Sequence, residues 1–148
     1  MLALMLCSHG NFAAGLKQAA GMICGELEKC EVISLWDANG LEGLTAEIRA
    51  AYDKLHAEGD EVVCLCDLPH ATPYNACCLA LSDTDVRVVS GMSLPLLINI
   101  ATQRDFVEPG KLDEFLQDCI NESRDSMELS VINNLFAQNE DDGDDFDF

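Results

Sequence analysis

Two short apolar runs constrain this chain more than any other feature, because each ends abruptly in polar residues. Met1 to Cys7 runs into Ser8-His9-Gly10, and Val62 to Cys66 runs into Asp67. Neither run alternates apolar and polar residues, which is typical of strands buried on both faces of a parallel sheet. In a doubly wound α/β sheet, ligands bind at the carboxyl ends of the strands. His9 and Asp67 are therefore candidate site residues, and they face each other if the two strands are neighbours.

Apolar runs and helical stripes alternate along the chain, which favours an α/β fold with right-handed crossovers and a parallel sheet. The predicted strands span 2–7, 31–36, 61–66 and 86–90, and the predicted helices span 11–24, 44–58, 72–82 and 94–104. The first two helices are predicted from apolar stripes at Phe12, Leu16, Ala19 and Ile23, and at Leu44, Ile48, Tyr52 and Leu55. Gly25 and Gly59 follow them as helix ends.

The third helix has favourable start chemistry, with Thr72 expected as its N-cap and Pro73 at its first position. After Asp105 the pattern changes. A further helix is predicted from the apolar stripe Leu112, Phe115, Leu116, Cys119 and Ile120. Residues 127–133 fit either more helix or a short strand. We therefore expect one domain over 1–133 and a separate acidic tail over 134–148.

Charge excludes several classes of partner. The chain has 148 residues and a formal net charge of −19, so nucleic acid and anionic membranes would repel it.

No apolar run is long enough to span a bilayer. Met1 to Cys7 lacks the basic flank of a signal peptide and is interpreted as a strand. Residues 140–148 carry six carboxylates and are expected to be a disordered, solvated end, with steering of a basic partner as the alternative.

Eight cysteines are many for this length. Without a secretory signal they are expected to be reduced, in a cytoplasmic protein. Cys64 and Cys66 should point to one face of a strand, and Cys77-Cys78 fits a helix. Neither pair has the C-x-x-C spacing of a zinc or redox site. We interpret these cysteines as small buried hydrophobic residues and predict no metal site.

His9 has the surroundings of a nucleophile. A carboxylate on one ring nitrogen fixes the tautomer and leaves the other nitrogen free to attack. Gly10 leaves the imidazole uncovered and allows a sharp turn into the next helix. The amino ends of that helix and of the helix at Thr72 offer backbone N–H groups to an anion. A phosphoryl group on His9 is the natural candidate.

Other interpretations of these residues stay open. His9 could be a loop histidine, and Asp67 could cap the helix at Thr72. His70 fits an exposed bystander or a second phosphate contact better than a nucleophile, because it has no obvious orienting carboxylate. His56 is expected to be structural or exposed. The sequence contains no G-x-S-x-G, no G-x-x-x-x-G-K-[ST] and no G-x-G-x-x-G, which disfavours a serine hydrolase and a nucleotide site.

Taken together, four segments resemble the IIA component of the mannose-type phosphoenolpyruvate-dependent sugar phosphotransferase system. They are Ser8-His9-Gly10, Asp67, Thr72-Pro73-Tyr74-Asn75-Ala76 and Val88 to Pro95, and the match runs to about residue 104, more weakly to 133. The resemblance implies a flavodoxin-like sheet of order 2-1-3-4 with helices on both faces. It also implies a C-terminal helix and a homodimer that exchanges a C-terminal strand, for which 127–133 is the candidate.

The resemblance further implies that His9 accepts a phosphoryl group from the carrier HPr and passes it to a IIB component. The IIB component phosphorylates the sugar as it enters through membrane IIC and IID proteins. Asp67 would orient His9, and Gly10, Ala71 and Thr72 would bind the phosphoryl group, with His70 as a weaker candidate. No cofactor is implied.

Two alternatives remain. One is a related subunit that phosphorylates a dihydroxyacetone kinase. The other is a non-catalytic binding or regulatory module on the same scaffold, with the acidic tail as its docking element.

Overall fold

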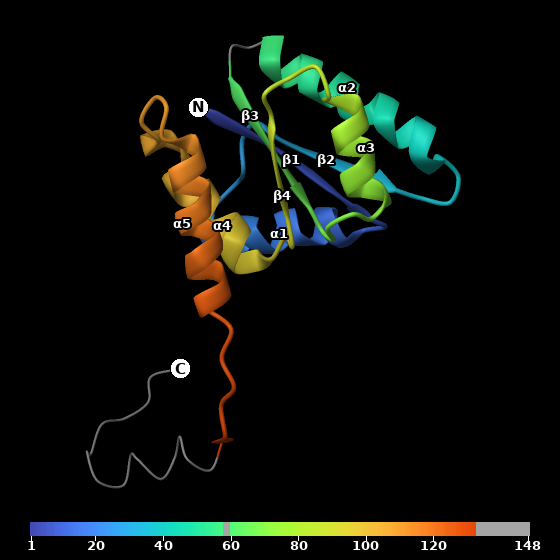
Figure 1. Cartoon of the computed structure of the whole chain (residues 1–148). Helices are drawn as coiled ribbons and strands as arrows, with labels where there is room; N and C mark the ends of the chain where they lie inside the picture. The colour runs from blue at the N-terminus through green and yellow to red at the C-terminus, as the bar shows by residue number, and fades with distance from the viewer. Residues whose placement is uncertain (58–59, 133–148) are drawn as a thin grey trace, which may run out of the picture.

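The computed structural model describes residues 1–57 and 60–132, which form a sheet with helices packed on both faces (Figure 1). The strands are β1 (Leu2–His9), β2 (Cys30–Leu35), β3 (Glu61–Cys66) and β4 (Arg87–Ser90). The helices are α1 (Phe12–Cys24), α2 (Gly40–Ala57), α3 (Thr72–Ala80), α4 (Leu94–Gln103) and α5 (Leu112–Asp125), with a 3-10 turn, η1 (Arg104–Phe106), after α4. The predicted alternation of strands and helices is confirmed.

All strand pairs are parallel, and the order is β2-β1-β3-β4, as the resemblance implied. β1 is therefore central, between β2 and β3. In this register Cys7 pairs with Cys66, so Ser8 and Asp67 are the next residues along the two strands, and β1 continues to His9 beside β2. This topology brings the ends of the two apolar runs to the same edge of the sheet.

The β1 strand divides the core into two layers. Leu2, Leu4 and Leu6 pack with α1, α4 and α5, whereas Ala3, Met5 and Cys7 pack with α2 and α3. Figure 1 shows the same division, with α2 and α3 on one side of the strands and α1, α4 and α5 on the other. Every residue from Leu2 to Ser8 is buried, which explains why this strand is apolar without alternation.

The predicted core stripe of the first helix is partly wrong. Phe12 and Ile23 are 46% and 62% exposed, and the buried positions are Ala13, Leu16 and Ala20. Two of the three buried positions are alanines, so Phe12 and Ile23 lie on the solvent side of the helix while Leu16 packs inward. The Gly25 end is confirmed, with a positive φ of 85°.

The other predicted stripes are confirmed. Leu44, Ile48, Tyr52 and Leu55 are all buried on α2. On α5, Leu112, Leu116 and Cys119 are buried, and Phe115 and Ile120 are partly buried against the same core. The predicted end at Gly59 lies outside the described residues.

Residues 127–131 form neither helix nor strand, and Figure 1 shows the chain leaving the body of the molecule after α5. Their apolar side chains are exposed, with Leu129 at 93%. The acidic tail at 134–148 and Asn133 lie outside the described residues. Within the described part of the chain, no helix combines the length and apolar character needed to cross a membrane.

Candidate active site

His9 and Asp67 meet at the carboxyl edge of the sheet, one at the end of β1 and the other directly after β3. The His9 ring nitrogen Nδ1 lies 2.7 Å from Asp67 Oδ2, and the backbone N–H of His9 donates to the same oxygen at 2.9 Å. The imidazole is half exposed, with 47% of the side chain accessible, whereas the carboxylate is 12% accessible. The pair therefore shields its carboxylate and presents its ring to solvent.

The carboxylate is fixed from several directions. Its second oxygen, Oδ1, accepts the backbone N–H of Leu68 at 2.8 Å, and the Asp67 N–H donates to the Cys7 carbonyl at 3.3 Å. An ionised carboxylate only accepts hydrogen bonds, so Nδ1 carries the proton in the neutral ring. Nε2 then keeps its lone pair and is the ring nitrogen that this contact leaves unoccupied. Asp67 thus binds His9 and does not cap α3.

The turn after His9 depends on Gly10 and Ser8. Gly10 has φ of 51°, in the left-handed region, and its N–H donates to the Leu35 carbonyl at 2.9 Å. A Cβ on Gly10 would lie 3.7 Å from the Trp36 ring. The buried Ser8 Oγ accepts the Ala13 N–H at 2.8 Å, which satisfies one donor of the first turn of α1. Ser8 therefore anchors α1 to the strand end, a role that the sequence analysis missed although the motif includes this serine.

The start of α3 differs by one residue from the prediction. Ala71 is the N-cap, with extended φ and ψ of −82° and 173°, and Thr72 is already helical, with Pro73 in the first turn. The shift arises because His70 takes φ of 60° and turns the chain before Ala71. The first intrahelical bond runs from the Asn75 N–H to the Ala71 carbonyl, so the N–H groups of Thr72 and Tyr74 point out of the helix start.

His70 does not share the surroundings of His9. Its ring packs edge-on against Tyr74, with centroids 5.3 Å apart, and its carbonyl accepts the Asn75 side-chain N–H at 3.2 Å. In the described chain no carboxylate contacts the His70 ring, and no hydrogen bond joins His9 to His70, Ala71 or Thr72. His56 stacks on Tyr52 at 5.2 Å, away from this edge, as expected of a structural or exposed histidine.

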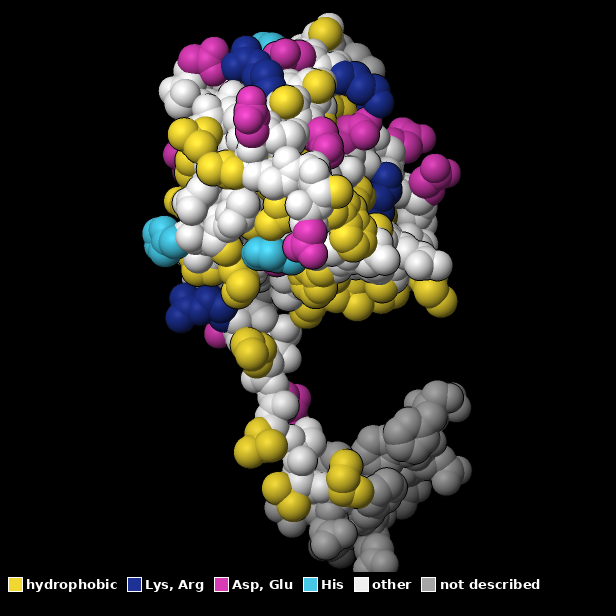
Figure 2. All heavy atoms as spheres, turned by 90° about the vertical axis from the view of Figure 1, so that its right-hand side faces the viewer, with side chains coloured by type: hydrophobic (Ala, Val, Ile, Leu, Met, Phe, Trp, Pro, Cys, Tyr) yellow, Lys and Arg dark blue, Asp and Glu magenta, His cyan; other side chains and the backbone are white. Residues whose placement is uncertain are grey.

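Exposed apolar side chains follow three of the strand ends at this edge of the sheet. Phe12, Trp36 and Leu68 follow strands β1, β2 and β3, and they are 46%, 49% and 56% exposed. Figure 2 views this edge of the sheet and shows hydrophobic side chains gathered around histidines low on the face. We call Phe12, Trp36 and Leu68 the apolar rim. Their exposure follows from their position after the strands, which the sequence analysis did not use.

Asp67 forms no ion pair with lysine or arginine among the described residues. Arg104 is buried at the opposite edge, where it donates to the carbonyls of Leu2 at 3.2 Å and Glu28 at 2.7 Å. It therefore ties the end of α4 to the start of β1 and is no part of the site.

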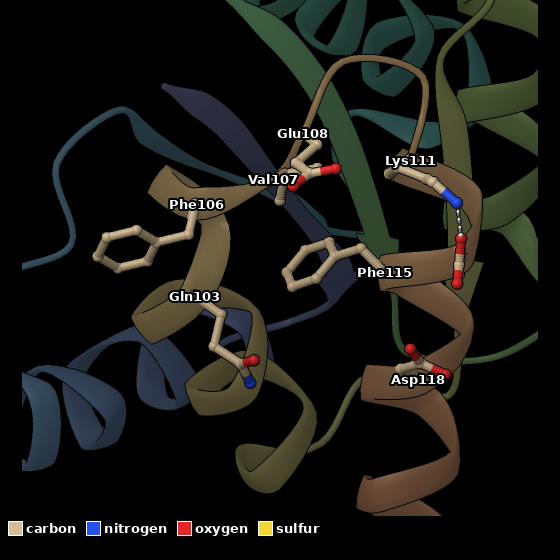
Figure 3. Close-up of a pocket in the computed structure, with 8 residues that line it drawn as sticks. Gln103, Phe106, Val107, Glu108, Lys111, Phe115 and Asp118 are labelled. Carbon is tan, nitrogen blue, oxygen red and sulfur yellow. Dashed lines mark hydrogen bonds and ion pairs between the residues drawn. The ribbon is translucent and has the colours of Figure 1, made fainter.

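A hollow of about 380 Å³ lies between η1 and α5, also at the opposite edge (Figure 3). Phe106 and Phe115 line it with Lys111, which pairs with Glu114 at 2.6 Å. The residues that line the hollow include no histidine or cysteine. Fold and site together define a class: a doubly wound α/β protein with a carboxylate-bound, half-exposed imidazole at the carboxyl edge of its sheet.

Comparison with known proteins identifies the family. Residues 3–117 match the family model "PTS system fructose IIA component", so the chain belongs to this family. It is 28% identical over 106 residues to the fructose-specific EIIA component of Bacillus subtilis, covering 71% of this chain and 72% of the relative. It is 29% identical over 132 residues to the sorbose-specific EIIA component of Lacticaseibacillus casei, covering 88% and 94%.

A solved structure has the same fold. The mannose/sorbose-specific IIA subunit from Enterococcus faecalis aligns with a TM-score of 0.73 and 27% identity, covering 87% of this chain and 94% of that one. The resemblance to mannose-type IIA components is therefore confirmed. The chain is a phosphoryl carrier in sugar uptake, with a transferase role.

Proposed function

We propose that Nε2 of His9 accepts the phosphoryl group from the phosphohistidine of HPr and passes it to a IIB component. The hydrogen bond between Nδ1 and Asp67 is the observation that carries this assignment, because it directs the lone pair of Nε2 toward solvent. The IIB component then phosphorylates the sugar that enters through the membrane proteins IIC and IID.

The transfer needs no cofactor. The Nε2 lone pair attacks phosphorus, the nitrogen–phosphorus bond of phospho-HPr breaks, and the electron pair returns to the donor imidazole. The His9 ring gains positive character as the new bond forms, and the Asp67 carboxylate 2.7 Å away stabilises it. Phosphoryl transfer depends on in-line positioning and charge stabilisation, which a fixed, half-exposed imidazole permits.

Backbone donors support the phosphoryl group in this proposal. The N–H groups of Thr72 and Tyr74 are free of intrahelical bonds at the start of α3, and the positive end of the helix dipole lies there. Thr72 adds a hydroxyl. Gly10 contributes through the space it leaves, since its own N–H is bonded to Leu35. Ala71, the N-cap of the helix, and the exposed His70 remain in the proposed set of residues that bind the phosphoryl group.

The apolar rim supports transfer between proteins. Phe12, Trp36 and Leu68 give HPr and IIB a common docking surface around His9, and bound protein excludes water from the reacting atoms. The donor or acceptor protein would supply further positive charge to the phosphoryl group.

A homodimer completes the proposed assembly. Met127, Leu129 and Val131 are exposed apolar residues at alternate positions, the spacing of a strand, and β4 is an edge strand of the sheet. We propose that residues 127–133 of one protomer add to the sheet of a second copy.

The functional test is phosphoryl uptake with phosphoenolpyruvate, enzyme I and HPr. His9→Ala should abolish uptake, whereas His70→Ala and His56→Ala should retain it. Uptake by His9→Ala at the parent rate would overturn the proposal. Offering the phosphorylated protein a IIB component or a dihydroxyacetone kinase subunit then separates the two acceptors, and release to IIB is expected.

A further inference from the structure

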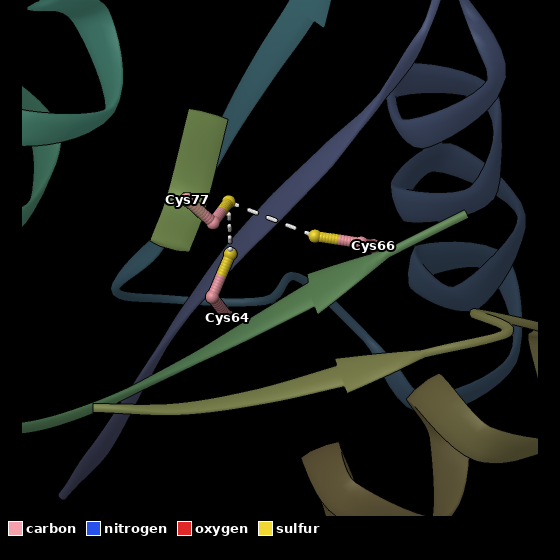
Figure 4. A group of neighbouring side chains, drawn as sticks. All are labelled: Cys64, Cys66 and Cys77. Atoms are coloured by element: carbon pink, nitrogen blue, oxygen red, sulfur yellow. Dashed lines mark hydrogen bonds between the residues drawn. The ribbon is translucent and has the colours of Figure 1, made fainter. Parts of the chain in front are cut away.

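Four cysteine thiols gather in the core directly beneath the His9–Asp67 pair. Cys64 and Cys66 point to the same face of β3, as predicted, and Cys77 of α3 lies over them (Figure 4). The Sγ of Cys77 is 3.1 Å from that of Cys64 and 3.6 Å from that of Cys66. The three sulfur atoms lie within 4.8 Å of one another.

Cys7 extends this group from the neighbouring strand. It is the register partner of Cys66 and belongs to the same side of the core. Hydrogen bonds to Cys66 and Cys77, and then burial, raise the pKa of the Cys7 thiol. All four side chains are 0% exposed and unbridged. We call Cys7, Cys64, Cys66 and Cys77 the thiol cluster.

We propose that the thiol cluster binds one thiophilic cation, Cu⁺ or Zn²⁺. The donor set decides the class of metal, because it consists of sulfur alone, and thiolates select Cu⁺ and Zn²⁺ over Mg²⁺ or Ca²⁺. This inference goes beyond the transfer reaction, which uses none of these cysteines, and it replaces the interpretation of these residues as packing groups only.

The spacing of the sulfur atoms suits such an ion. A metal–sulfur distance of about 2.3 Å in a tetrahedral site separates the sulfur atoms by about 3.8 Å. Two of the observed separations, 3.1 Å and 3.6 Å, are somewhat shorter than that value, and the third is at most 4.8 Å. The sulfur atoms are therefore already close to the spacing of a metal site, and they are carried by the regular elements β1, β3 and α3.

Protons balance on binding. Each thiol that coordinates the cation releases its proton to solvent and contributes a thiolate. The positive ion then offsets the negative charge that the apolar surroundings would otherwise oppose. In the metal-free protein the core accommodates these cysteines as small hydrophobic groups.

The test uses the full, reduced chain under anaerobic conditions. The protein is equilibrated with Zn²⁺, or with Cu⁺ held by a weak competing ligand, and excess metal is removed. We expect one ion per chain and a thiolate-to-metal charge-transfer absorption for at least one of the two cations. The double variant Cys64→Ala/Cys77→Ala should lose both signals.

Two controls locate the ion. The matched double variant Cys30→Ala/Cys119→Ala removes two buried cysteines outside the cluster and should retain the ion. His9→Ala should also retain it, which separates the cluster from the surface imidazole. Retention by Cys64→Ala/Cys77→Ala, loss from His9→Ala, or no retained metal in the parent would overturn the proposal.

A second measurement keeps the proposal testable if the cluster variant fails to fold. Alkylation of the parent in mild denaturant, mapped by mass spectrometry, should show the four cluster thiols protected by the metal while Cys24 and Cys78 react. Equal labelling of the cluster with and without metal would contradict it.

Discussion

At the scale of single residues, the account depends on how Asp67 holds His9. Both oxygens of this carboxylate accept backbone N–H groups, from His9 at 2.9 Å and Leu68 at 2.8 Å, so its position is set before the imidazole binds. The ring then has one orientation and one tautomer. Asp67 is therefore a positioning and charge-stabilising residue, and its removal should affect the rate more than the fold.

Asp67→Asn should slow phosphoryl acceptance from phospho-HPr on the order of a hundredfold. The amide keeps the shape but loses the negative charge that stabilises the ring as the new bond forms. Transfer rate and circular dichroism should be measured together. Asp37→Asn, an exposed aspartate after β2, is the matched control and should keep the parent rate. An unchanged rate in Asp67→Asn would remove Asp67 from the mechanism.

At the scale of elements, the strand end and the following helix are joined by Ser8. Its buried Oγ accepts the Ala13 N–H at 2.8 Å, and the serine itself lies in β1. Ser8→Ala leaves that donor without a partner, and we expect the free energy of unfolding to fall by about 1 kcal/mol. Urea denaturation measures the change.

Ser34→Ala is the control for this element, because Ser34 lies on β2 and its hydroxyl makes no hydrogen bond in the described chain. Its free energy of unfolding should change by less than about 0.5 kcal/mol. Equal losses in both variants would show that Ser8 contributes only as any strand serine does and does not anchor α1.

The sequence allowed the elements of the sheet to be predicted because its strands are apolar runs between clear turn residues. It also placed His9 and Asp67 at one edge, because parallel strands end together.

The predicted start of α3 was wrong by one residue. The left-handed turn at His70, which packs against Tyr74 and whose carbonyl accepts a hydrogen bond from the Asn75 side chain, makes Ala71 the N-cap. The inward face of α1 was partly wrong because apolar spacing alone does not reveal which side must approach the sheet closely. The thiol cluster was missed because its cysteines come from three elements and have no motif spacing.

At the scale of the whole molecule, stability in acid should depend on Asp60, the residue directly before β3. Its carboxylate pairs with Lys29 and, at 3.2 Å, with the amino group of Met1, and 6% of the side chain is exposed. The hydrogen bond from Lys29 lowers the pKa of Asp60 below its ordinary value. The unfolded state therefore binds the proton more readily, so this stabilisation is present above the unfolded pKa and is lost as the pH falls through the folded pKa.

We expect Asp60→Asn to be less stable than the parent at pH 7, with the difference shrinking below about pH 4. Denaturant unfolding at several pH values measures it. Asp53→Asn removes an exposed pair with Arg49 and should show little difference at any pH. A gap between Asp60→Asn and the parent that persists unchanged into acid would contradict the assignment.

Assembly is the second property at this scale. Leu129→Asp places a charge in the exposed apolar segment proposed to pair with a second copy. Light scattering should show a dimer for the parent and a monomer for Leu129→Asp, while Phe106→Asp, in an exposed residue of η1, should remain dimeric. A monomeric parent would contradict the exchanged strand.

The central claim is that Asp67 leaves Nε2 of His9 as the atom that carries phosphorus. Phosphorus NMR of the protein, phosphorylated through phosphoenolpyruvate, enzyme I and HPr, distinguishes the two nitrogen isomers of phosphohistidine. The account predicts a single phosphohistidine signal, of the Nε2 isomer, that disappears in His9→Ala. A signal from the Nδ1 isomer, or one that persists in His9→Ala and disappears in His70→Ala, would contradict it.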